Sequence, residues 1–452
     1  MNEMITIKKF VKIIGGKCYL IGGAVIDSIQ GREIKDWDIE VYGKSLVEIE
    51  DALKCAGLEA NMVGASFGVI KTKYEGLDID LSVPRRENRV GIGHKGFEVE
   101  LDPTMTPKEA GRRRDLTINS MYLDIETGEI VDHFGGLRDL KYGIIQATDE
   151  NTFTEDPLRV LRIMQLLPRK GSSVVRATVM LCASMAEEFN SLPKERVFAE
   201  FEKLLMKADK PSAGVYFLYD CRWLCHFPEI KNLLGCAQNK EWHPEGDVFK
   251  HTMRVIDLAA SYRDSLPEDW RLPFMFGALL HDVGKPSTTD EDLTSKKHDV
   301  AGGPIAETFM RRITDDSQLI ERVVSIVVNH MRCGQLVTGN AKTSAWKRLH
   351  NELRLDVAAA MSKADSMSRY TEGKEHEPSR IAMEYFEKFG ETKIQPVVMG
   401  RHLIKIGMKP GPQFKKILDE AYKIQIEEDM ESPSAILEKI TGIPYSNSIM
   451  GI

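Results

Sequence analysis

Two aspartates separated by one residue follow a glycine pair near the start of the chain. Asp36 and Asp38 stand at the start of an expected strand, and the two-residue period of a strand places both carboxylates on one face. Carboxylates grouped in this way suit Mg²⁺, which prefers oxygen ligands and usually keeps substrate phosphates and water. Gly22 and Gly23 lead into an expected helix, whose first backbone N–H groups can receive phosphate oxygens. The pattern indicates phosphoryl transfer assisted by two metal ions.

The same residues also have a purely structural interpretation. Asp36 can cap an element, Asp38 can be solvated, and a glycine pair is a common turn, since D-x-D and G-G both occur widely. Asp80, in the apolar run LDIDLSV, is a candidate third carboxylate. The carboxylates alone leave both interpretations open.

Basic residues follow in GRRRDLTINS, where Arg112, Arg113 and Arg114 precede Asp115. The arginine guanidinium pairs two phosphate oxygens at once, so this run suits a triphosphate. A solvated basic turn would have the same composition.

A second motif, TEDPLRVLR, predicts the start of a helix with Asp156 as its N-cap and Pro157 as its first residue. Asp156, Arg159 and Arg162 recur at intervals of three residues and therefore share one helix face. An acid beside an arginine presents acceptor and donor groups to the edge of a nucleobase, much as a complementary base does. Helix capping with an i,i+3 ion pair explains the same residues without a ligand.

Histidines and aspartates recur through the C-terminal half, each in or beside an expected helix with an apolar face. A single buried histidine is more often structural than a ligand, but six such groups spread over several helices favour a metal site. Imidazole and carboxylate are the ligands of a hydrolytic divalent cation, which makes water a nucleophile at neutral pH. Lys285 is a candidate phosphate contact. The six residues are His251, His281, Asp282, His298, His330 and Asp365.

The periodicity changes from α/β to helical along the chain. Residues 86–111, rich in glycine, proline and charge, are predicted to form a long mobile loop. From Pro157 onward helices are expected, with breaks near 168–171, 192–193, 210–211 and 227–228. Before that point, strands are expected at 17–21, 38–42, 67–74 and 77–83, and helices at 24–30 and 46–58.

The composition is that of an ordinary globular protein, with 42% hydrophobic and 29% charged residues. No apolar run approaches the roughly 18 to 20 residues of a membrane-spanning helix, and the N-terminus lacks a signal-peptide pattern. Seven scattered cysteines without a C-x-x-C pair favour a reducing compartment. We therefore expect a cytoplasmic protein without membrane association. The net charge of −7 argues against indiscriminate coating of nucleic acid.

Five motifs in order resemble those of bacterial-type CCA-adding tRNA nucleotidyltransferases and their poly(A) polymerase relatives, over roughly residues 18–235: IGGAVID, KDWDIEV, RRDLTINS, DHFGGLRDL and EDPLRVLR. The resemblance implies a multidomain α+β protein, with a polymerase-β-like nucleotidyltransferase head, an all-α neck and body, and an all-α HD domain. The expected boundaries are 1–148 for the head, 149–238 for the neck and body, 239–371 for the HD domain and 372–452 for a helical tail.

The same resemblance implies roles for the site residues. Asp36 and Asp38 would be the Mg²⁺ ligands and catalytic carboxylates, and Asp156 and Arg159 would pair with the incoming CTP or ATP. Residues 86–111 would be the flexible loop that moves between C and A addition. The nucleotide would also meet Gly22, Gly23, Arg114 and Arg162.

The C-terminal half resembles HD-domain phosphohydrolases, and HPEGDVFKHT resembles the subgroup fused to CCA-adding enzymes. The resemblance implies hydrolysis of 2′,3′-cyclic phosphates, 2′-nucleotides and other phosphoesters. His298 and His330 match accessory positions. The residues that match the core ligands of a divalent metal, of unspecified identity, are His251, His281, Asp282 and Asp365.

Two departures remove expected positive charges near the nucleotide, because Ile26 and Gln165 replace arginines of the family pattern. Loss of one charge-assisted contact typically costs about 1.5 to 3 kcal/mol. The catalytic carboxylates are intact, so an active transferase is still expected.

We therefore expect a tRNA nucleotidyltransferase that adds CCA from CTP and ATP and carries a phosphohydrolase. No stable protein partner is implied, and monomer and homodimer are both open. The alternatives are a poly(A) or A-adding polymerase, an HD phosphohydrolase with a non-catalytic RNA-binding head, and hydrolysis of signalling nucleotides. The segment of about 25 residues at 86–111 and the HD motifs favour CCA addition.

Overall fold

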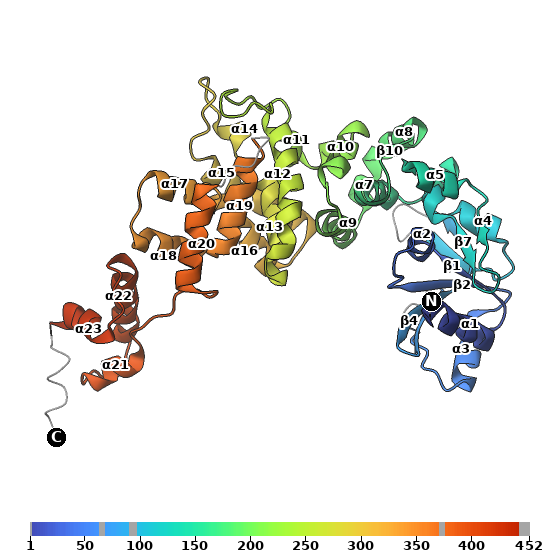
Figure 1. Cartoon of the computed structure of the whole chain (residues 1–452), viewed down its shortest axis with the longest axis horizontal. Coiled ribbons are helices and arrows are strands. Elements are labelled where there is room, and N and C mark those ends of the chain that lie inside the picture. Colours follow the sequence, from blue (N-terminus) through green and yellow to red (C-terminus); the bar gives the residue numbers. More distant parts are fainter. Residues whose placement is uncertain (1, 63–67, 90–96, 370–375, 443–452) are drawn as a thin grey trace. The chain divides into compact units, whose positions relative to one another are not determined.

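The computed structural model describes residues 2–62, 68–89, 97–369 and 376–442. The chain divides into two compact units, Met1–His226 and Phe227–Ile452 (Figure 1). Among the described residues, no helix is both long enough and apolar enough to cross a membrane.

The first unit contains a mixed sheet of six strands in the order β3-β4-β2-β1-β7-β8. The β2 and β4 strands run parallel, whereas the other neighbouring pairs are antiparallel. The parallel pair matters for the site, because it brings Asp38 and Asp80 into register. The strands are β1 (Lys17–Ile21), β2 (Trp37–Tyr42), β3 (Val69–Tyr74), β4 (Leu77–Ser82), β7 (Tyr122–Asp124) and β8 (Ile130–Val131).

Three helices accompany the sheet: α1 (Asn2–Ile14), α2 (Gly23–Ile29) and α3 (Leu46–Cys55). The buried apolar stripe of α1 packs toward the sheet, and the Phe10 ring lies 5.2 Å from that of Tyr74 on β3. The α3 helix begins with a reciprocal capping box between Ser45 and Glu48. The predicted strands and helices before residue 84 are therefore confirmed, with ends shifted by a few residues.

The prediction of a long loop over residues 86–111 is wrong for the described part of that segment. Strands β5 (Arg85–Arg89) and β6 (Phe97–Leu101) form an antiparallel ladder. A capping box between Thr106 and Glu109 then starts α4 (Pro107–Arg112). The charged sequence RRENR has no apolar alternation, so its strand depends on backbone pairing with β6 rather than on a local pattern. Residues 90–96 of the segment lie outside the described residues.

A buried charged network joins β2 to the segment that follows α4. Glu40 Oε1 accepts a hydrogen bond from Arg114 Nη2 at 3.0 Å, and Glu40 Oε2 accepts one from Tyr42 Oη at 2.6 Å. The Arg114 guanidinium also lies over the Tyr122 ring, 5.2 Å from its centroid. The ion pair therefore ties the arginine motif to the strand that carries Asp38.

Replacement of Glu40 is expected to destabilise the protein. The Glu40→Gln change leaves the Arg114 charge buried without its carboxylate, which should lower the free energy of unfolding by about 2 to 3 kcal/mol. Urea unfolding of the full chain, followed by circular dichroism, measures the difference. Glu126→Gln, at an exposed glutamate after β7, is the matched control and should change little. Equal midpoints for all three proteins would contradict a stabilising role for the network.

The rest of the first unit is helical. The central helix α7 packs against α9 and α10. The break predicted near residues 168–171 is confirmed, because α7 ends at Lys170 with Gly171 as its C-cap, and Pro168 lies within the last turn of the helix. The helices are α5 (Gly136–Tyr142), α6 (Glu150–Phe153), α7 (Leu158–Lys170), α8 (Arg176–Ser184), α9 (Lys194–Lys207) and α10 (Ser212–Asp220), and the short strands β9 (Ile144–Ile145) and β10 (Ser173–Val174) pair with each other.

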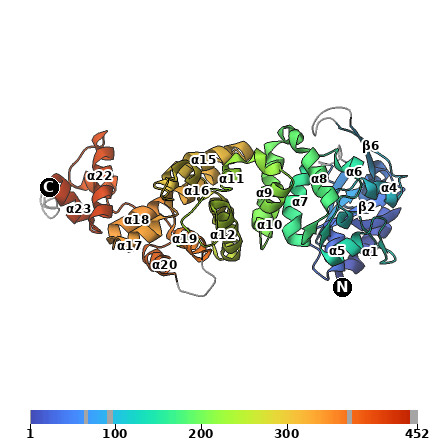
Figure 2. The same cartoon turned by 90° about the horizontal axis from the view of Figure 1, so that it is seen from above.

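The second unit is helical throughout its regular elements. Figures 1 and 2 show α12, α13, α15, α16 and α19 packed side by side, and a separate apolar cluster joins α21, α22 and α23. The helices are α11 (Pro228–Lys231), α12 (Val248–Tyr262), α13 (Glu268–Leu280), α14 (Lys285–Thr288), α15 (His298–Ile313), α16 (Ser317–Asn329), α17 (Arg332–Thr338), α18 (Thr343–Glu352), α19 (Leu355–Met367), α20 (Glu377–Phe389), α21 (Gly400–Lys405), α22 (Gln413–Glu427) and α23 (Pro433–Thr441).

Candidate functional sites

The first candidate site is a group of carboxylates on the parallel strands β2 and β4. Asp38 and Asp80 are direct neighbours in the β2–β4 register, so their side chains share one face of the sheet. Lys71 on β3 pairs with Asp80 at 2.7 Å. Asp36 lies one residue before β2 begins, so the strand period predicted from the sequence applies to Asp38 but does not reach Asp36.

Electrostatics nevertheless connect the three carboxylates. Burial, together with the negative charges of Asp80 and Asp36, raises the pKa of Asp38 to about 6. Such mutual repulsion is relieved when a cation neutralises the group, and oxygen donors are the ligands that Mg²⁺ prefers. The residues present therefore fit a magnesium site.

The glycine pair forms the turn between β1 and α2. Gly22 has φ 62° and ψ −133°, a conformation that L-residues with a side chain rarely adopt. A Cβ atom placed on Gly22 or Gly23 would meet no other atom within 4 Å, so the backbone here is open to approach.

The two positions that depart from the family pattern face the interior. The Ile26 side chain is only 1% exposed and belongs to the core. Gln165 is also buried, and its Oε1 accepts a hydrogen bond from Arg169 Nη1 at 2.5 Å. Asp27, next to Ile26, pairs with Lys170 at 2.7 Å. Arg169 and Lys170 thus keep positive charge on α7 close to these positions.

The arginine motif and the EDPLR motif contact each other through residues that lie 42 to 47 positions apart in sequence. Arg113 pairs with Glu155 at 2.9 Å. Arg159 donates to the carbonyl oxygens of Thr152 and Arg113, at 2.5 and 2.7 Å. Arg162 pairs with the buried carboxylate of Asp115 at 2.7 Å. The positive charge of Arg162 holds the pKa of Asp115 below its usual value, although burial alone would raise it.

The helix α7 begins one residue later than predicted, so Pro157, and not Asp156, is its N-cap. Asp156 still contacts the start of the helix, because Leu158 N–H donates to Asp156 Oδ1 at 3.0 Å. Asp156 Oδ2 lies 3.3 Å from Arg196 Nη2 on α9, a pairing that the i,i+3 pattern did not predict. Asp156 and Arg159 are therefore held by separate sets of contacts.

The second candidate site is a buried cluster centred on Asp282. His281 Nε2 and His251 Nε2 lie 3.2 and 3.8 Å from Asp282 Oδ2. On the other side, His298 Nε2 and His330 Nε2 lie 3.3 and 3.9 Å from Asp282 Oδ1. All six residues predicted for this half meet here, since Asp365 on α19 lies 3.0 Å from His251 Nε2. His350, in contrast, donates to the Thr392 carbonyl and lies outside this group.

Each histidine of the cluster has its Nδ1 atom bound to an acceptor, which sets the tautomer. A carbonyl or carboxylate oxygen can only accept, so Nδ1 carries a proton, and in the neutral ring the lone pair is then on Nε2. His251 Nδ1 faces Glu245 Oε1 at 2.7 Å. The other three face carbonyl oxygens at 2.7 to 2.9 Å: His281 that of Ala278, His298 that of Ser295 and His330 that of Val327.

The lone pairs point into a cluster of other acceptors. His298 Nε2 and His330 Nε2 lie 3.2 Å apart, and His251 Nε2 lies 3.0 Å from Asp365 Oδ1. Acceptors at these distances repel unless a proton or a cation lies between them. His281 Nε2 and Asp282 Oδ2 are moreover buried without a hydrogen-bond partner. The imidazole and carboxylate set therefore fits a divalent cation.

Two backbone segments of this cluster approach each other closely at Gly284. A Cβ atom on Gly284 would lie 2.1 Å from the carbonyl oxygen of His298, so only glycine allows the turn after His281 to approach the start of α15. Burial would raise the pKa of Asp282 and of Asp365, but the neighbouring His281 and the Lys285 ammonium around the first, and the Arg369 guanidinium beside the second, outweigh it and hold both pKa values well below the usual range.

The histidines of the cluster titrate differently. Burial would lower the pKa of His251, but its contacts with Asp365 and Glu245 raise that pKa above the ordinary value. In the same way, the contact with Asp282 outweighs burial and raises the pKa of His298. Burial and the neighbouring His281 lower the pKa of His330 to about 4. His330 thus favours the neutral form that a metal ligand needs.

Several polar contacts of the cluster were not predicted from the sequence. Lys285 pairs with Asp282 at 2.8 Å and donates to Gln238, and Arg369 pairs with Asp365 at 2.7 Å. Among the described residues, three groups of histidine and carboxylate ligands have their atoms within 4.8 Å of one another, and all three lie in this unit: His243–Glu245–His251, His251–His281–Asp365 and Asp282–His298–His330.

Three parts of the chain match models of known protein families. Residues 18–146 match the family model of the poly A polymerase head domain, and residues 248–370 match the HD domain. Residues 174–234 match a probable RNA- and SrmB-binding site of polymerase A. The predicted fold class, a nucleotidyltransferase head followed by helices and an HD domain, is confirmed.

Similar proteins have been named multifunctional CCA proteins. One from Nitrosospira multiformis is 38% identical over 61% of this chain and 63% of its own length, slightly less than two thirds of that relative. One from Acinetobacter baumannii is 33% identical over 75% of this chain and 79% of its own length. The CCA-adding enzyme of Bacillus stearothermophilus in complex with CTP shares the fold, with a TM-score of 0.66, 18% identity and 97% of each chain covered. The chain belongs to the multifunctional CCA protein family.

Proposed function

We propose that this protein adds C, C and A to the 3′ end of tRNA from CTP and ATP, and that its HD domain hydrolyses phosphoesters. The observation that carries the transferase proposal is the in-register pair Asp38 and Asp80 with Asp36 beside it, on the parallel strands of the head. The reaction is an in-line attack of the tRNA terminal hydroxyl on the α-phosphate, with pyrophosphate as the leaving group. Similarity to the CCA-adding enzyme bound to CTP supports the nucleotide substrate.

Asp36 and Asp38 would hold Mg²⁺ and act as the catalytic carboxylates. When bound, the metal supplies neutralisation of the triphosphate and activation of the attacking hydroxyl. The glycine turn at Gly22 and Gly23 leaves backbone open to the nucleotide. Arg114, buried beside Glu40, would contribute positive charge at the same edge of the sheet.

Base selection would fall to the EDPLR motif. Asp156 and Arg159 would present acceptor and donor groups to the base edge, and Arg162 would complete the nucleotide contacts. The hydrogen bonds from Arg159 to two backbone carbonyls hold its guanidinium in one orientation, as a protein template requires.

The HD cluster would hold a divalent metal through His251, His281, Asp282 and Asp365. When bound, such a cation supplies a nucleophile from water at neutral pH. Hydrolysis of 2′,3′-cyclic phosphates and 2′-nucleotides would remove groups that block a damaged RNA end. The identity of this metal is left open by the mixed nitrogen and oxygen ligands.

The proposed partners are tRNA, CTP and ATP, and the proposed location is the cytoplasm, with the protein as a monomer or homodimer. We also propose the domain boundaries expected from the sequence, with the head at 1–148, the neck and body at 149–238, the HD domain at 239–371 and the tail at 372–452.

The base-selection proposal is tested by Arg159→Ala. We expect the wild type to incorporate C and A and to exclude G and U, and the variant to lose about tenfold to a hundredfold of this discrimination, because one or two hydrogen bonds to the base edge are lost. Incorporation of each labelled nucleotide onto tRNA lacking CCA measures the ratios. Arg176→Ala, at an exposed arginine of the same unit, is the control. Unchanged ratios in a folded Arg159→Ala protein would refute the template role.

A further inference from the structure

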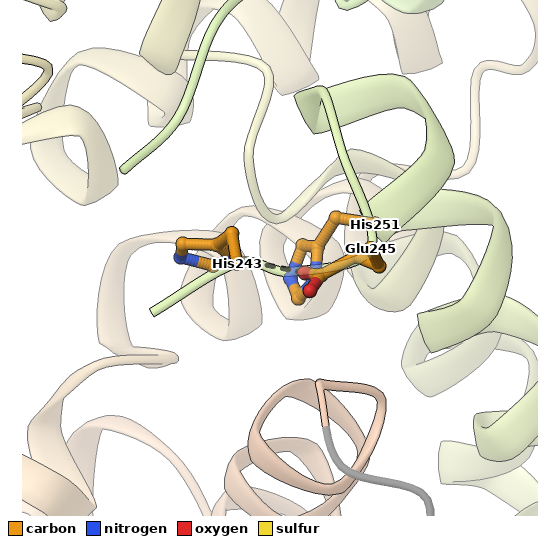
Figure 3. Close-up of side chains that lie close together, drawn as sticks. All are labelled: His243, Glu245 and His251. Carbon is orange, nitrogen blue, oxygen red and sulfur yellow. Dashed lines mark hydrogen bonds and ion pairs between the residues drawn. The ribbon is translucent and has the colours of Figure 1, made fainter. Parts of the chain in front are cut away.

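The loop before α12 places a second buried carboxylate behind the HD cluster. The Glu245 side chain is fully buried, and its Oε1 lies 2.7 Å from His251 Nδ1 and 2.8 Å from His243 Nδ1 (Figure 3). The loop itself is anchored by Asp247, the N-cap of α12, which accepts hydrogen bonds from the N–H groups of Lys250 and Gly235. Glu245 Oε1 thus makes both contacts with the histidine rings, whereas Glu245 Oε2 is buried without a hydrogen-bond partner among the described residues.

Glu245 and a cation bound at His251 Nε2 would contact opposite nitrogens of the His251 ring. A neutral imidazole has one nitrogen lone pair, and in His251 the Nε2 atom already faces Asp365 Oδ1 at 3.0 Å. If Nε2 binds a cation, Nδ1 carries the proton and must donate it. Glu245 is then the acceptor of that proton, and a cation among His243, Glu245 and His251 would need both nitrogens of His251 to be deprotonated.

His251 differs in this respect from the other three histidines of the cluster. Those donate Nδ1–H to neutral backbone carbonyls, whereas His251 donates to a carboxylate. A carboxylate acceptor makes the stronger, charge-assisted hydrogen bond and increases the electron density on the opposite ring nitrogen. The Ser368 hydroxyl lies 3.3 Å from the same Nδ1 and donates its own proton to the Asp365 carbonyl. Its oxygen is therefore a second acceptor for the proton on His251 Nδ1.

We propose that Glu245 is a positioning residue of the HD site: it fixes the tautomer of His251 and strengthens its Nε2 as a metal ligand, and His243 holds the Glu245 carboxylate in place. The proposal rests on the proposed metal-binding function of this cluster. Glu245 would act through His251, without contact to the metal or the substrate.

The test compares Glu245→Gln with the protein that keeps Glu245, called the wild type here. Both are full length, are stripped of metal and carry Asp36→Asn and Asp38→Asn, so that the head does not compete for Mn²⁺. The dissociation constant for Mn²⁺ is measured by the electron paramagnetic resonance signal of the free ion, and hydrolysis of 2′,3′-cyclic AMP is then followed as Mn²⁺ is increased. We expect Mn²⁺ to bind roughly 10- to 100-fold more weakly to the variant, and hydrolysis to recover at high Mn²⁺. Glu241→Gln, at an exposed glutamate on the same loop, is the matched control and should bind as the wild type does.

Each outcome decides a separate point. Unchanged Mn²⁺ affinity in a folded Glu245→Gln protein would overturn the positioning role while leaving the metal site intact. A wild type that binds no Mn²⁺ and hydrolyses no cyclic phosphate would instead refute the proposed HD function, and the positioning role with it. If Glu245→Gln does not fold, His243→Gln is tested instead, because it removes one of the two contacts to Glu245. A loss of roughly two- to tenfold in Mn²⁺ affinity would support the proposal. Unchanged Mn²⁺ affinity would overturn it.

Discussion

Replacement of Asp36 and Asp38 together by asparagine is expected to lower nucleotide incorporation by on the order of a thousandfold or more, while phosphoester hydrolysis continues. The reason is that metal-ion stabilisation of a phosphoryl-transfer transition state is worth several kcal/mol, and about 1.4 kcal/mol corresponds to a factor of ten in rate. Both side chains stay close in size and shape, and the raised pKa of Asp38 shows that loss of its charge relieves local repulsion. The variant is therefore expected to fold.

Incorporation of labelled CTP onto tRNA lacking CCA measures this effect, and hydrolysis of 2′,3′-cyclic AMP is measured in the same preparation. Asp78→Asn is the matched control, because Asp78 lies on the same strand as Asp80 but is exposed and pairs with Lys73. Retention of incorporation by the double variant would refute the catalytic assignment. Loss of both activities in a folded protein would contradict the independence of the two sites.

For Asp282→Asn we expect the opposite result, in which phosphoester hydrolysis is lost and nucleotide addition is retained. Asp282 lies between both groups of histidines and pairs with Lys285, so its charge affects every ligand of the cluster. We expect metal-dependent hydrolysis of 2′,3′-cyclic AMP to fall by on the order of a thousandfold, because the cation site would lose one of its carboxylate ligands. Addition of CCA should continue at the wild-type rate.

This prediction is measured with both assays after removal and controlled return of Mn²⁺. Asp290→Asn is the matched control, since Asp290 is an exposed aspartate in the loop after α14. Melting curves establish that the variant is folded, because Asp282→Asn leaves the buried Lys285 without its carboxylate. Hydrolysis at the wild-type rate would remove the HD assignment.

The alternation of apolar and polar residues predicted the strands of the head correctly where the apolar positions are also the buried ones. The alternation in LDIDLS matches β4, in which Ile79 and Leu81 are buried. The pattern failed at β5, because RRENR forms a strand only through pairing with a distant segment. The break predicted near residues 168–171, in contrast, is where α7 ends, at Lys170 with Gly171 as its C-cap.

The candidate sites, like the fold, were predicted from the sequence only in part. The types and order of His251, His281, Asp282 and Asp365 predicted a common site, and the helices bring them together. The contacts of Arg159 with backbone carbonyls, and the place of Glu245 behind His251, depend on tertiary geometry that a single sequence does not show. The spacing H-P-E-G-D before α12 was visible, but only the structure shows which atom of His251 Glu245 contacts.

Ordered extension of tRNA tests the central proposal most directly. Transcripts that end before CCA, after the first C and after CC are each incubated with Mg²⁺ and with CTP, ATP, GTP and UTP, singly and together, and the products are separated at single-nucleotide resolution. We predict that each transcript is completed to CCA, that CTP and ATP alone are used, and that synthesis then stops. Continued addition of A would indicate a poly(A) polymerase, and an absence of incorporation together with intact hydrolysis of 2′,3′-cyclic AMP would contradict the transferase function of the head.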